Sequence, residues 1–305
     1  MFLNSIDTLV MHYFLILLIS STLFSCSFNQ SKSTDNNPIV WNDTVINKEQ
    51  LLQFSLDNSE DYRKVLEMLD KGDLASLDAA KILLINSVAD TLIRDSMFVD
   101  FIDFYHSVAG GYLENNENIM GKLENTPSKE AIDQLKSNLA PYGFLLSQSK
   151  GTFYLEPQTE YLLQNFGAVL SPAYRDYLTI GSKEQKSGFA EDRDYRIPSD
   201  SLIARIITWE NFMTRYPNFI SILMAEDQYA RYMGALLAGT NETKVFNSET
   251  NLLSDSSKLA FESLILKNPE SKSSEVVKAY LELLKTTNFN YTDKVDSFLI
   301  EKVYH

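Results

Sequence analysis

Apolar residues recur every three to four positions along most of this chain, the spacing that gathers them on one face of an α-helix. The stretch 73–110 shows the pattern best, and Asp90 within it is a suitable helix N-cap. Gly110 and Gly111 are expected to loosen or end this helical run, because glycine is a weak helix former. A further helix is predicted to begin at Pro127, since proline is well suited to the first helical position.

Residues 143–156 follow a different pattern. Two short runs of apolar or β-preferring residues, 144–146 and 152–155, are joined by a segment with the composition of a hairpin turn, 147–151. We predict a β-hairpin here. It must pack on helices, because a two-stranded sheet alone is only marginally stable.

The second half of the chain contains an internal similarity. The segments 209–217 and 261–269 align without gaps: each has an aromatic residue, Glu, a small polar residue, two large apolar residues, a basic residue and a final Pro. Each predicts a helix that ends at its proline, and a second predicted helix follows, at 221–237 or 274–286. Such self-similarity is typical of helical repeats that bury a continuous core by stacking.

These elements predict a mostly α fold, a repeat-like array of helix hairpins with a small β-hairpin near the middle. The helical domain is placed at 48–305, with halves 48–141 and 157–305 around the β-hairpin. The stretch 209–233 is also similar to the tetratricopeptide-like units of many envelope lipoproteins, with a fainter counterpart that begins at Phe261. The distance between the copies exceeds the tetratricopeptide period. The resemblance therefore implies helix-hairpin architecture and not membership of the tetratricopeptide family.

An apolar run at 14–24 stands apart from the amphipathic segments. It is too short to span a bilayer and is typical of a cleaved export signal. The sequence Leu-Phe-Ser-Cys that ends at Cys26 resembles the lipobox of bacterial lipoproteins. The resemblance implies a signal peptide at 1–25, whether translation starts at Met1 or at Met11, and an acylated Cys26 as the new N-terminus.

Acylation would attach the domain to a membrane. Each buried methylene contributes about 0.8 kcal/mol, so two or three acyl chains hold a protein firmly. The polar segment 26–47 would be a flexible tether. We therefore expect a lipid-anchored protein of the bacterial cell envelope, in the outer rather than the inner membrane, with a periplasmic or a surface-facing orientation left open.

The composition narrows the classes of partner. The chain has 305 residues, 44% of them hydrophobic, which is ample for a core, and a formal net charge of -14. Nucleic acids and anionic lipid headgroups attract basic surfaces, so neither is expected as a partner. We interpret the negative charge as a source of solubility, with recruitment of a cationic partner as the alternative.

Residue types that carry most hydrolytic chemistry are scarce. After the signal segment the histidines are His106 and His305, and His106 with Asp103 on one helix face is interpreted as a surface ion pair. One histidine beside a carboxylate falls short of the ligands that zinc needs. We predict no catalytic residue, cofactor or metal site. Carboxylate pairs such as Glu156 and Glu160 leave one alternative, a hydrolase that acts on envelope polysaccharide.

Aromatic residues are numerous, with 16 tyrosines and 18 phenylalanines, and most are expected to fill helix contacts. Tyr216, Tyr229 and Tyr232 are our candidates for an exposed ligand-binding patch. Thr44 is a candidate for modification, because Asp43-Thr44-Val45 resembles the acceptor tripeptide for O-glycosylation of envelope proteins in some Gram-negative bacteria. The sequence as a whole predicts a non-enzymatic binding or scaffolding module whose partners are other envelope proteins or glycans.

Overall fold

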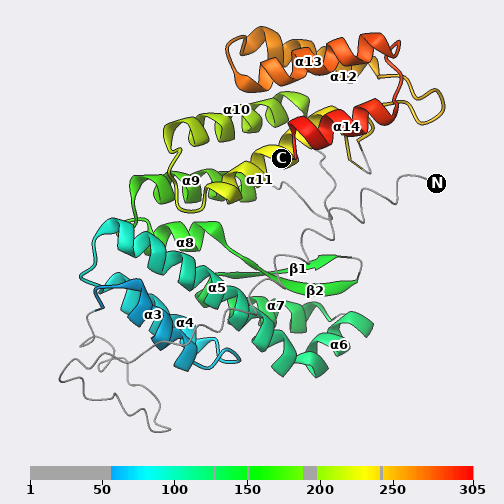
Figure 1. Ribbon diagram of the computed structural model, residues 1–305. Coiled ribbons are helices and arrows are strands. Elements are labelled where there is room, and N and C mark those ends of the chain that lie inside the picture. Colours follow the sequence, from blue (N-terminus) through cyan, green and yellow to red (C-terminus); the bar gives the residue numbers. More distant parts are fainter. Residues whose placement is uncertain (1–55, 127, 150, 188–197, 241–242, 305) are drawn as a thin grey trace, which may run out of the picture. The chain divides into compact units, whose positions relative to one another are not determined.

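A computed structural model gives the fold of the chain (Figure 1). It describes residues 56–304 except 127, 150, 188–197 and 241–242, and all of these belong to one compact unit, Ile46–His305. The predicted signal peptide and tether lie outside the described residues, and so do Cys26, Thr44 and His305.

Helices dominate the described part of the chain, which confirms the predicted mostly α fold. Before the hairpin lie α3 (Ser59–Met68), α4 (Ala75–Ile85), α5 (Thr91–Asn115), α6 (Glu117–Asn125), α7 (Lys129–Leu139) and a 3-10 turn, η1 (Ala140–Tyr142). The strands are β1 (Phe144–Ser149) and β2 (Thr152–Pro157). After them lie α8 (Thr159–Phe166), α9 (Pro172–Lys186), α10 (Ser199–Arg215), α11 (Ile222–Ala238), α12 (Asp255–Lys267), α13 (Lys272–Thr286) and α14 (Asp293–Lys302).

The predicted β-hairpin is present, and helices support it from two sides. Its strands pair antiparallel, with Phe144 opposite Pro157. The ring of Phe144 stacks on that of Tyr105 in α5, with centroids 4.3 Å apart. The carboxylate of Glu124 in α6 accepts the backbone N–H of Phe153 at 3.0 Å. The helices thus provide the burial that two strands cannot provide alone.

The longest helix, α5, passes through both glycines that were expected to loosen or end it. It runs for 25 residues to Asn115 and begins at the predicted N-cap Asp90, whose carboxylate accepts two backbone N–H groups of the first turn. A Cβ atom at Gly111 would lie 2.4 Å from the carbonyl oxygen of Lys71. Close packing against the turn before α4 therefore requires glycine at this position and outweighs its weak helix propensity.

The start of α7 also differs from the prediction. The helix begins at Lys129 behind the N-cap Ser128, whereas Pro127 was expected at its first position. The hydroxyl of Ser128 accepts the backbone N–H of Ala131, which satisfies one of the amide groups that a helix start leaves free. Side-chain capping therefore sets this boundary. Pro127 itself lies outside the described residues.

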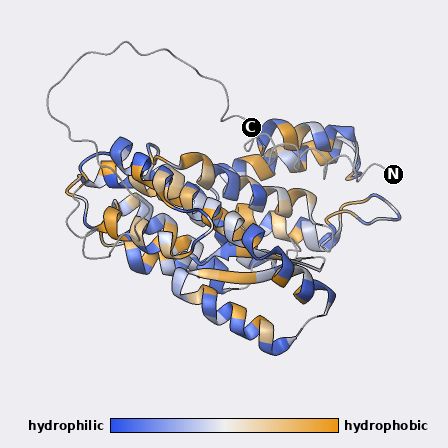
Figure 2. Cartoon of the chain, turned by 90° about the horizontal axis from the view of Figure 1, so that it is seen from below, coloured by the Kyte–Doolittle hydropathy of each residue, from blue (hydrophilic) through white to orange (hydrophobic). Residues whose placement is uncertain are grey.

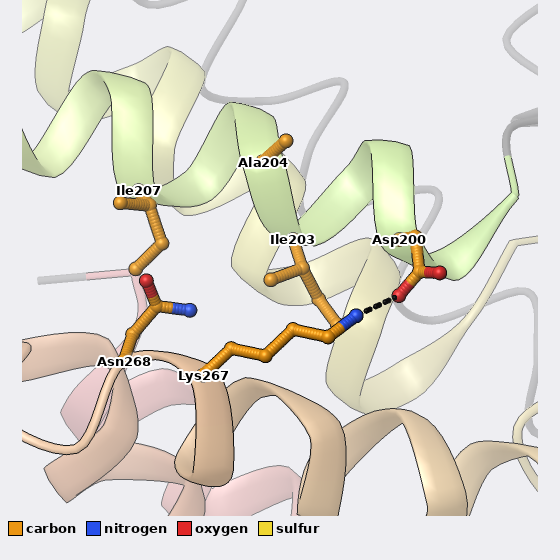
Figure 3. Close-up of a pocket in the computed structure, with 6 residues that line it drawn as sticks. All are labelled: Asp200, Ile203, Ala204, Ile207, Lys267 and Asn268. Carbon is orange, nitrogen blue, oxygen red and sulfur yellow. Dashed lines mark hydrogen bonds and ion pairs between the residues drawn. The ribbon is translucent and has the colours of Figure 1, made fainter.

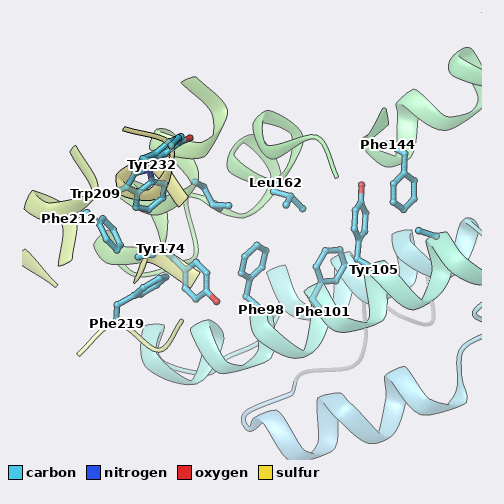
Figure 4. Close-up of a cluster of buried hydrophobic side chains, with 14 of the residues drawn as sticks. Phe98, Phe101, Tyr105, Phe144, Leu162, Tyr174, Trp209, Phe212, Phe219 and Tyr232 are labelled. Atoms are coloured by element: carbon cyan, nitrogen blue, oxygen red, sulfur yellow. The ribbon is translucent and has the colours of Figure 1, made fainter. Parts of the chain in front are cut away.

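One hydrophobic core joins the two halves of the helical domain, and Figure 4 shows the aromatic rings at its centre. Successive ring contacts run from β1 to α10, with these centroid distances: Phe144–Tyr105 4.3 Å, Tyr105–Phe101 5.7 Å, Phe101–Phe98 6.1 Å, Phe98–Tyr174 5.0 Å, Tyr174–Phe219 4.8 Å, Phe219–Phe212 5.3 Å and Phe212–Trp209 5.7 Å. The edge-to-face contact of Phe98 with Tyr174 links α5 to α9. The halves before and after the β-hairpin therefore share one core.

The internal similarity corresponds to two helix hairpins, α10–α11 and α12–α13. Residues 52 positions apart share burial, as in the pairs Trp209 and Phe261, Phe212 and Leu264, Ala225 and Val277, and Tyr232 and Leu284. The residues before the two prolines have nearly the same backbone angles, φ -127° and ψ 60° at Tyr216, and φ -135° and ψ 58° at Asn268. One backbone arrangement is thus used twice.

Apolar and polar residues alternate around the helices, as Figure 2 shows by hydropathy. This pattern suits helices that bury one face against neighbours and expose the other to water. Among the helices of the described ranges, none combines the length and the apolar character needed to cross a membrane.

Gly110 and Gly111 provide a matched pair for testing the packing of α5. Gly110→Ala should raise the free energy of unfolding by about 0.5–1 kcal/mol, because its Cβ would meet nothing within 4 Å and alanine favours helix. Gly111→Ala should lower it by about 1–3 kcal/mol, because its Cβ would collide with the Lys71 carbonyl. Urea unfolding measures both, and shifts of the same sign would contradict the assignment.

Candidate functional site

Glu210 is the most buried carboxylate of the two repeated hairpins, with 9% of the residue exposed. It projects from α10 to the start of α13 and accepts the backbone N–H groups of Lys272 at 2.7 Å and Ser273 at 3.0 Å, together with the Ser273 hydroxyl. The N-cap Ser271 accepts the next free amide of the helix. The first N–H groups of a helix lack partners within it and favour negative charge. Glu210 therefore fixes the second hairpin on the first.

Asp95, in the first half of the chain, makes an equivalent contact with the second half. It lies on α5, is 4% exposed, and accepts the backbone N–H of Ser171 at 2.9 Å just before α9 begins. Burial raises the pKa of Asp95, while its hydrogen bonds with Ser171 act in the opposite direction. The carboxylate of one helix again satisfies the start of another.

Glu184 joins three helices through its side chain. From α9 it accepts the indole N–H of Trp209 at 3.0 Å and the hydroxyl of Tyr232 at 2.8 Å. The Arg205 guanidinium lies 5.7 Å from the centre of the Tyr232 ring. Burial raises the pKa of Glu184, and Tyr232, Arg205 and Trp209 partly oppose that effect. Both carboxylate oxygens face donors of the neighbouring helices, so the cluster stabilises the packing of α9, α10 and α11.

The three tyrosines predicted to form an exposed aromatic patch do not form one. Tyr232 is 1% exposed, and its hydroxyl is bound to Glu184. Tyr229 is half-buried, with its hydroxyl 3.1 Å from that of Ser273, and half-buried Tyr216 donates to Asp176 at 2.6 Å. An aromatic ring with a polar tip suits a contact between helices, where the ring is buried and the hydroxyl finds a partner.

The predicted carboxylate pair is divided between separate contacts. Glu156 in β2 accepts the hydroxyl of Ser147 across the hairpin at 2.6 Å. Glu160 in α8 forms an ion pair with Lys186 of α9 at 2.6 Å. Each carboxylate thus has its own structural partner.

The histidine on α5 belongs to the surface. His106 and Asp103 are both exposed. Within the ranges that the structure describes, no group of three or more His, Cys, Asp or Glu side chains is placed to hold a metal ion.

Clefts on the described surface include the following two. One, of about 330 Å³, separates α10 from α12 and is lined by Asp200, Ile203, Ala204, Ile207, Lys267 and Asn268 (Figure 3). Asp200 and Lys267 form an ion pair at 2.9 Å across its mouth. The other, of about 820 Å³, lies beside α6 and the start of α7, and Glu117 is its one carboxylate. Neither cleft brings two carboxylates together.

Large apolar side chains are exposed at several positions in the second half of the chain, and two groups of them lie close together in the sequence. Ile220, Leu223 and Met224 cluster at the start of α11 and are 52%, 75% and 54% exposed. Leu259 and Leu266 on α12 are 65% and 81% exposed. They lie seven positions, about two helical turns, apart and therefore share one face. Contiguous exposed apolar surface marks sites of interaction more often than scattered residues do.

Comparison with known proteins assigns no relative to the chain. No family model, no curated protein and no solved structure matches it. Its function is therefore inferred from its own side chains and surfaces.

The sequence interpretation did not identify Glu210, Glu184 or Asp95 as joints between helices. One signal for Glu210 was present, because the glutamate recurs as Glu262 in the aligned segments. The hydrogen-bond partners of these three carboxylates lie between 25 and 76 positions away along the chain. No local sequence pattern reveals contacts over such distances.

Glu210 and Glu262 form a matched pair for testing this joint. Glu210→Ala should lower the free energy of unfolding by about 2–3 kcal/mol, because it leaves buried donors of α13 without an acceptor. Glu262→Ala, on an exposed position, should change it by no more than about 0.5 kcal/mol. Urea unfolding of both variants provides the measurement. Equal losses in the free energy of unfolding would show that Glu210 does not stabilise the joint between α10 and α13.

Proposed function

We propose that the protein is a lipid-anchored binding or scaffolding module of the bacterial cell envelope. The observation that carries this proposal is the exposure of large apolar side chains on stacked helix hairpins, at 220–224 and on α12. Helical arrays commonly use such surfaces to bind partners. Aliphatic side chains favour a protein partner over a glycan, since sugars stack on aromatic rings and the candidate tyrosines are engaged within the fold.

The alternative, a carboxylate-based hydrolase, receives less support. Glycoside hydrolysis uses two carboxyl groups about 5–10 Å apart on either side of the bond to be cleaved. The cleft between α10 and α12 has Asp200, which is paired with Lys267, and the cleft beside α6 has Glu117. Binding is therefore the function that the geometry favours.

The anchor is tested at Cys26. Mass spectrometry of protein purified from membranes should find a mature N-terminus at Cys26 that carries two or three acyl chains. Cys26→Ser should abolish the modification and release the domain from the membrane fraction, because the acyl chains supply the attachment. An intact N-terminus with an unmodified Cys26 would overturn the proposed localisation.

The binding function is tested on the full-length, membrane-anchored chain. Chemical crosslinking in membranes followed by affinity purification should return the same protein partners in repeated preparations. A double variant with Leu223→Ser and Met224→Ser changes exposed residues and leaves the core untouched. It should recover less of any partner that binds at 220–224. Recovery of no partner from the unchanged chain would contradict the proposed function, and polysaccharide cleavage by the purified protein would replace it with the alternative.

A further inference from the structure

The two hairpins that repeat along the chain differ in what covers them. At the constant offset of 52 positions, Ile207 of α10 corresponds to Leu259 of α12, and Glu210 corresponds to Glu262. On α10 these residues belong to a face that packs on the next hairpin. On α12 both are exposed.

The covered face of α10 shows how one hairpin receives another. Ile203 and Ile207 line the cleft that faces α12 (Figure 3), and Glu210 satisfies the first amide groups of α13. Apolar contact is thus combined with one carboxylate aimed at a helix start. The carboxylate determines which end of the neighbouring helix lies beside it, because backbone N–H groups are free only at the N-terminal end of a helix.

The corresponding face of α12 repeats part of this arrangement and is exposed. Leu259 and Glu262 match Ile207 and Glu210, whereas Asp255 takes the place of Ile203, and Leu266 that of the exposed Thr214. Leu259 and Leu266 are 65% and 81% exposed, and Glu262 lies between them along the same face. The position of the buried Ile206 is taken by the exposed Lys258, so the apolar surface is a single stripe. Covering the two exposed leucines with another apolar surface would be favourable, because it removes apolar area from water. Exposed apolar residues that share one face mark sites of interaction.

We propose that this face of α12 receives a helix hairpin from a partner protein, with Glu262 as the acceptor for the first N–H groups of a partner helix. The proposal rests on the proposed binding function and assigns it a surface and a kind of partner. The contact continues the stacking by which α10 receives the α12–α13 hairpin. The partner therefore presents an apolar helix face next to the start of a helix that has a serine or threonine in its first turn, as α13 has Ser273.

A second copy of this chain is a poor occupant. Leu259 lies three positions before Glu262 and Leu266 four positions after it, so an antiparallel pairing of two α12 helices through these leucines would bring the two Glu262 carboxylates close together. Like charges in direct contact are unfavourable. The formal net charge of -14 further opposes self-association.

The test places a photo-crosslinking amino acid, p-benzoylphenylalanine, at position 259 or 266 of the full-length chain in its own membranes. The same probe at the equally exposed Leu223 is the comparison site. Positions 259 and 266 should both crosslink one partner protein, and peptide mapping should place the crosslinks at the first turns of a helix. Glu262→Lys should lower the yield about tenfold, a loss of about 1.4 kcal/mol, whereas Glu249→Lys, a matched change at another exposed glutamate, should leave it unchanged.

Glu262→Gln, which keeps the shape of the side chain, should lower the yield less than Glu262→Lys, and circular dichroism should show unchanged melting for each variant. Crosslinks to another copy of this chain, or yields unaffected by Glu262→Lys, would overturn the proposal. Crosslinks from position 223 without any from 259 or 266 would overturn it while the binding function stands. Absence of protein crosslinks from all three positions, with no partner in the purification, would contradict both.

Discussion

The packing of this domain depends on carboxylates that reach from one helix to the start of another. Burying a carboxylate away from water is costly unless it is hydrogen-bonded, and a buried helix start is costly for the same reason. Asp95 at Ser171 and Glu210 at Lys272 and Ser273 remove both costs with one contact. Because each contact has a defined direction and length, it fixes where α9 begins against α5 and where α13 begins against α10.

The aromatic residues also contribute to the packing of helices against helix starts. Their rings form the continuous core from β1 to α10, and tyrosine hydroxyls at its edge meet serines at helix starts. Tyr174 contacts Ser221 at 2.6 Å, and Tyr229 contacts Ser273 at 3.1 Å. A tyrosine between helices thus contributes apolar area and also satisfies a polar group. The abundance of aromatic residues therefore reflects the stacking of helices, and most of the large apolar side chains that remain exposed are not aromatic.

Polar groups engaged in packing are not free for chemistry, which shapes the functional proposal. Glu184 shares its oxygens with Trp209 and Tyr232, and Asp200 in the cleft beside α12 is paired with Lys267. The surface features that remain are apolar stripes on helices, such as Leu259 and Leu266. These features agree with the proposed binding function, and in that proposal α12 is the face on which the stacking of hairpins continues onto a partner.

The sequence by itself determined the helical class, the hairpin near the middle and the two aligned helix ends, because periodicity, turn residues and proline act over a few neighbouring positions. It misjudged Gly111, whose lack of a side chain serves a contact with Lys71 about forty residues earlier. It also misjudged Tyr232, which its spacing placed on a surface and the fold buried. Only the tertiary structure decided which carboxylates join helices and which, like Glu262, stay exposed, since burial depends on neighbours that are distant along the chain.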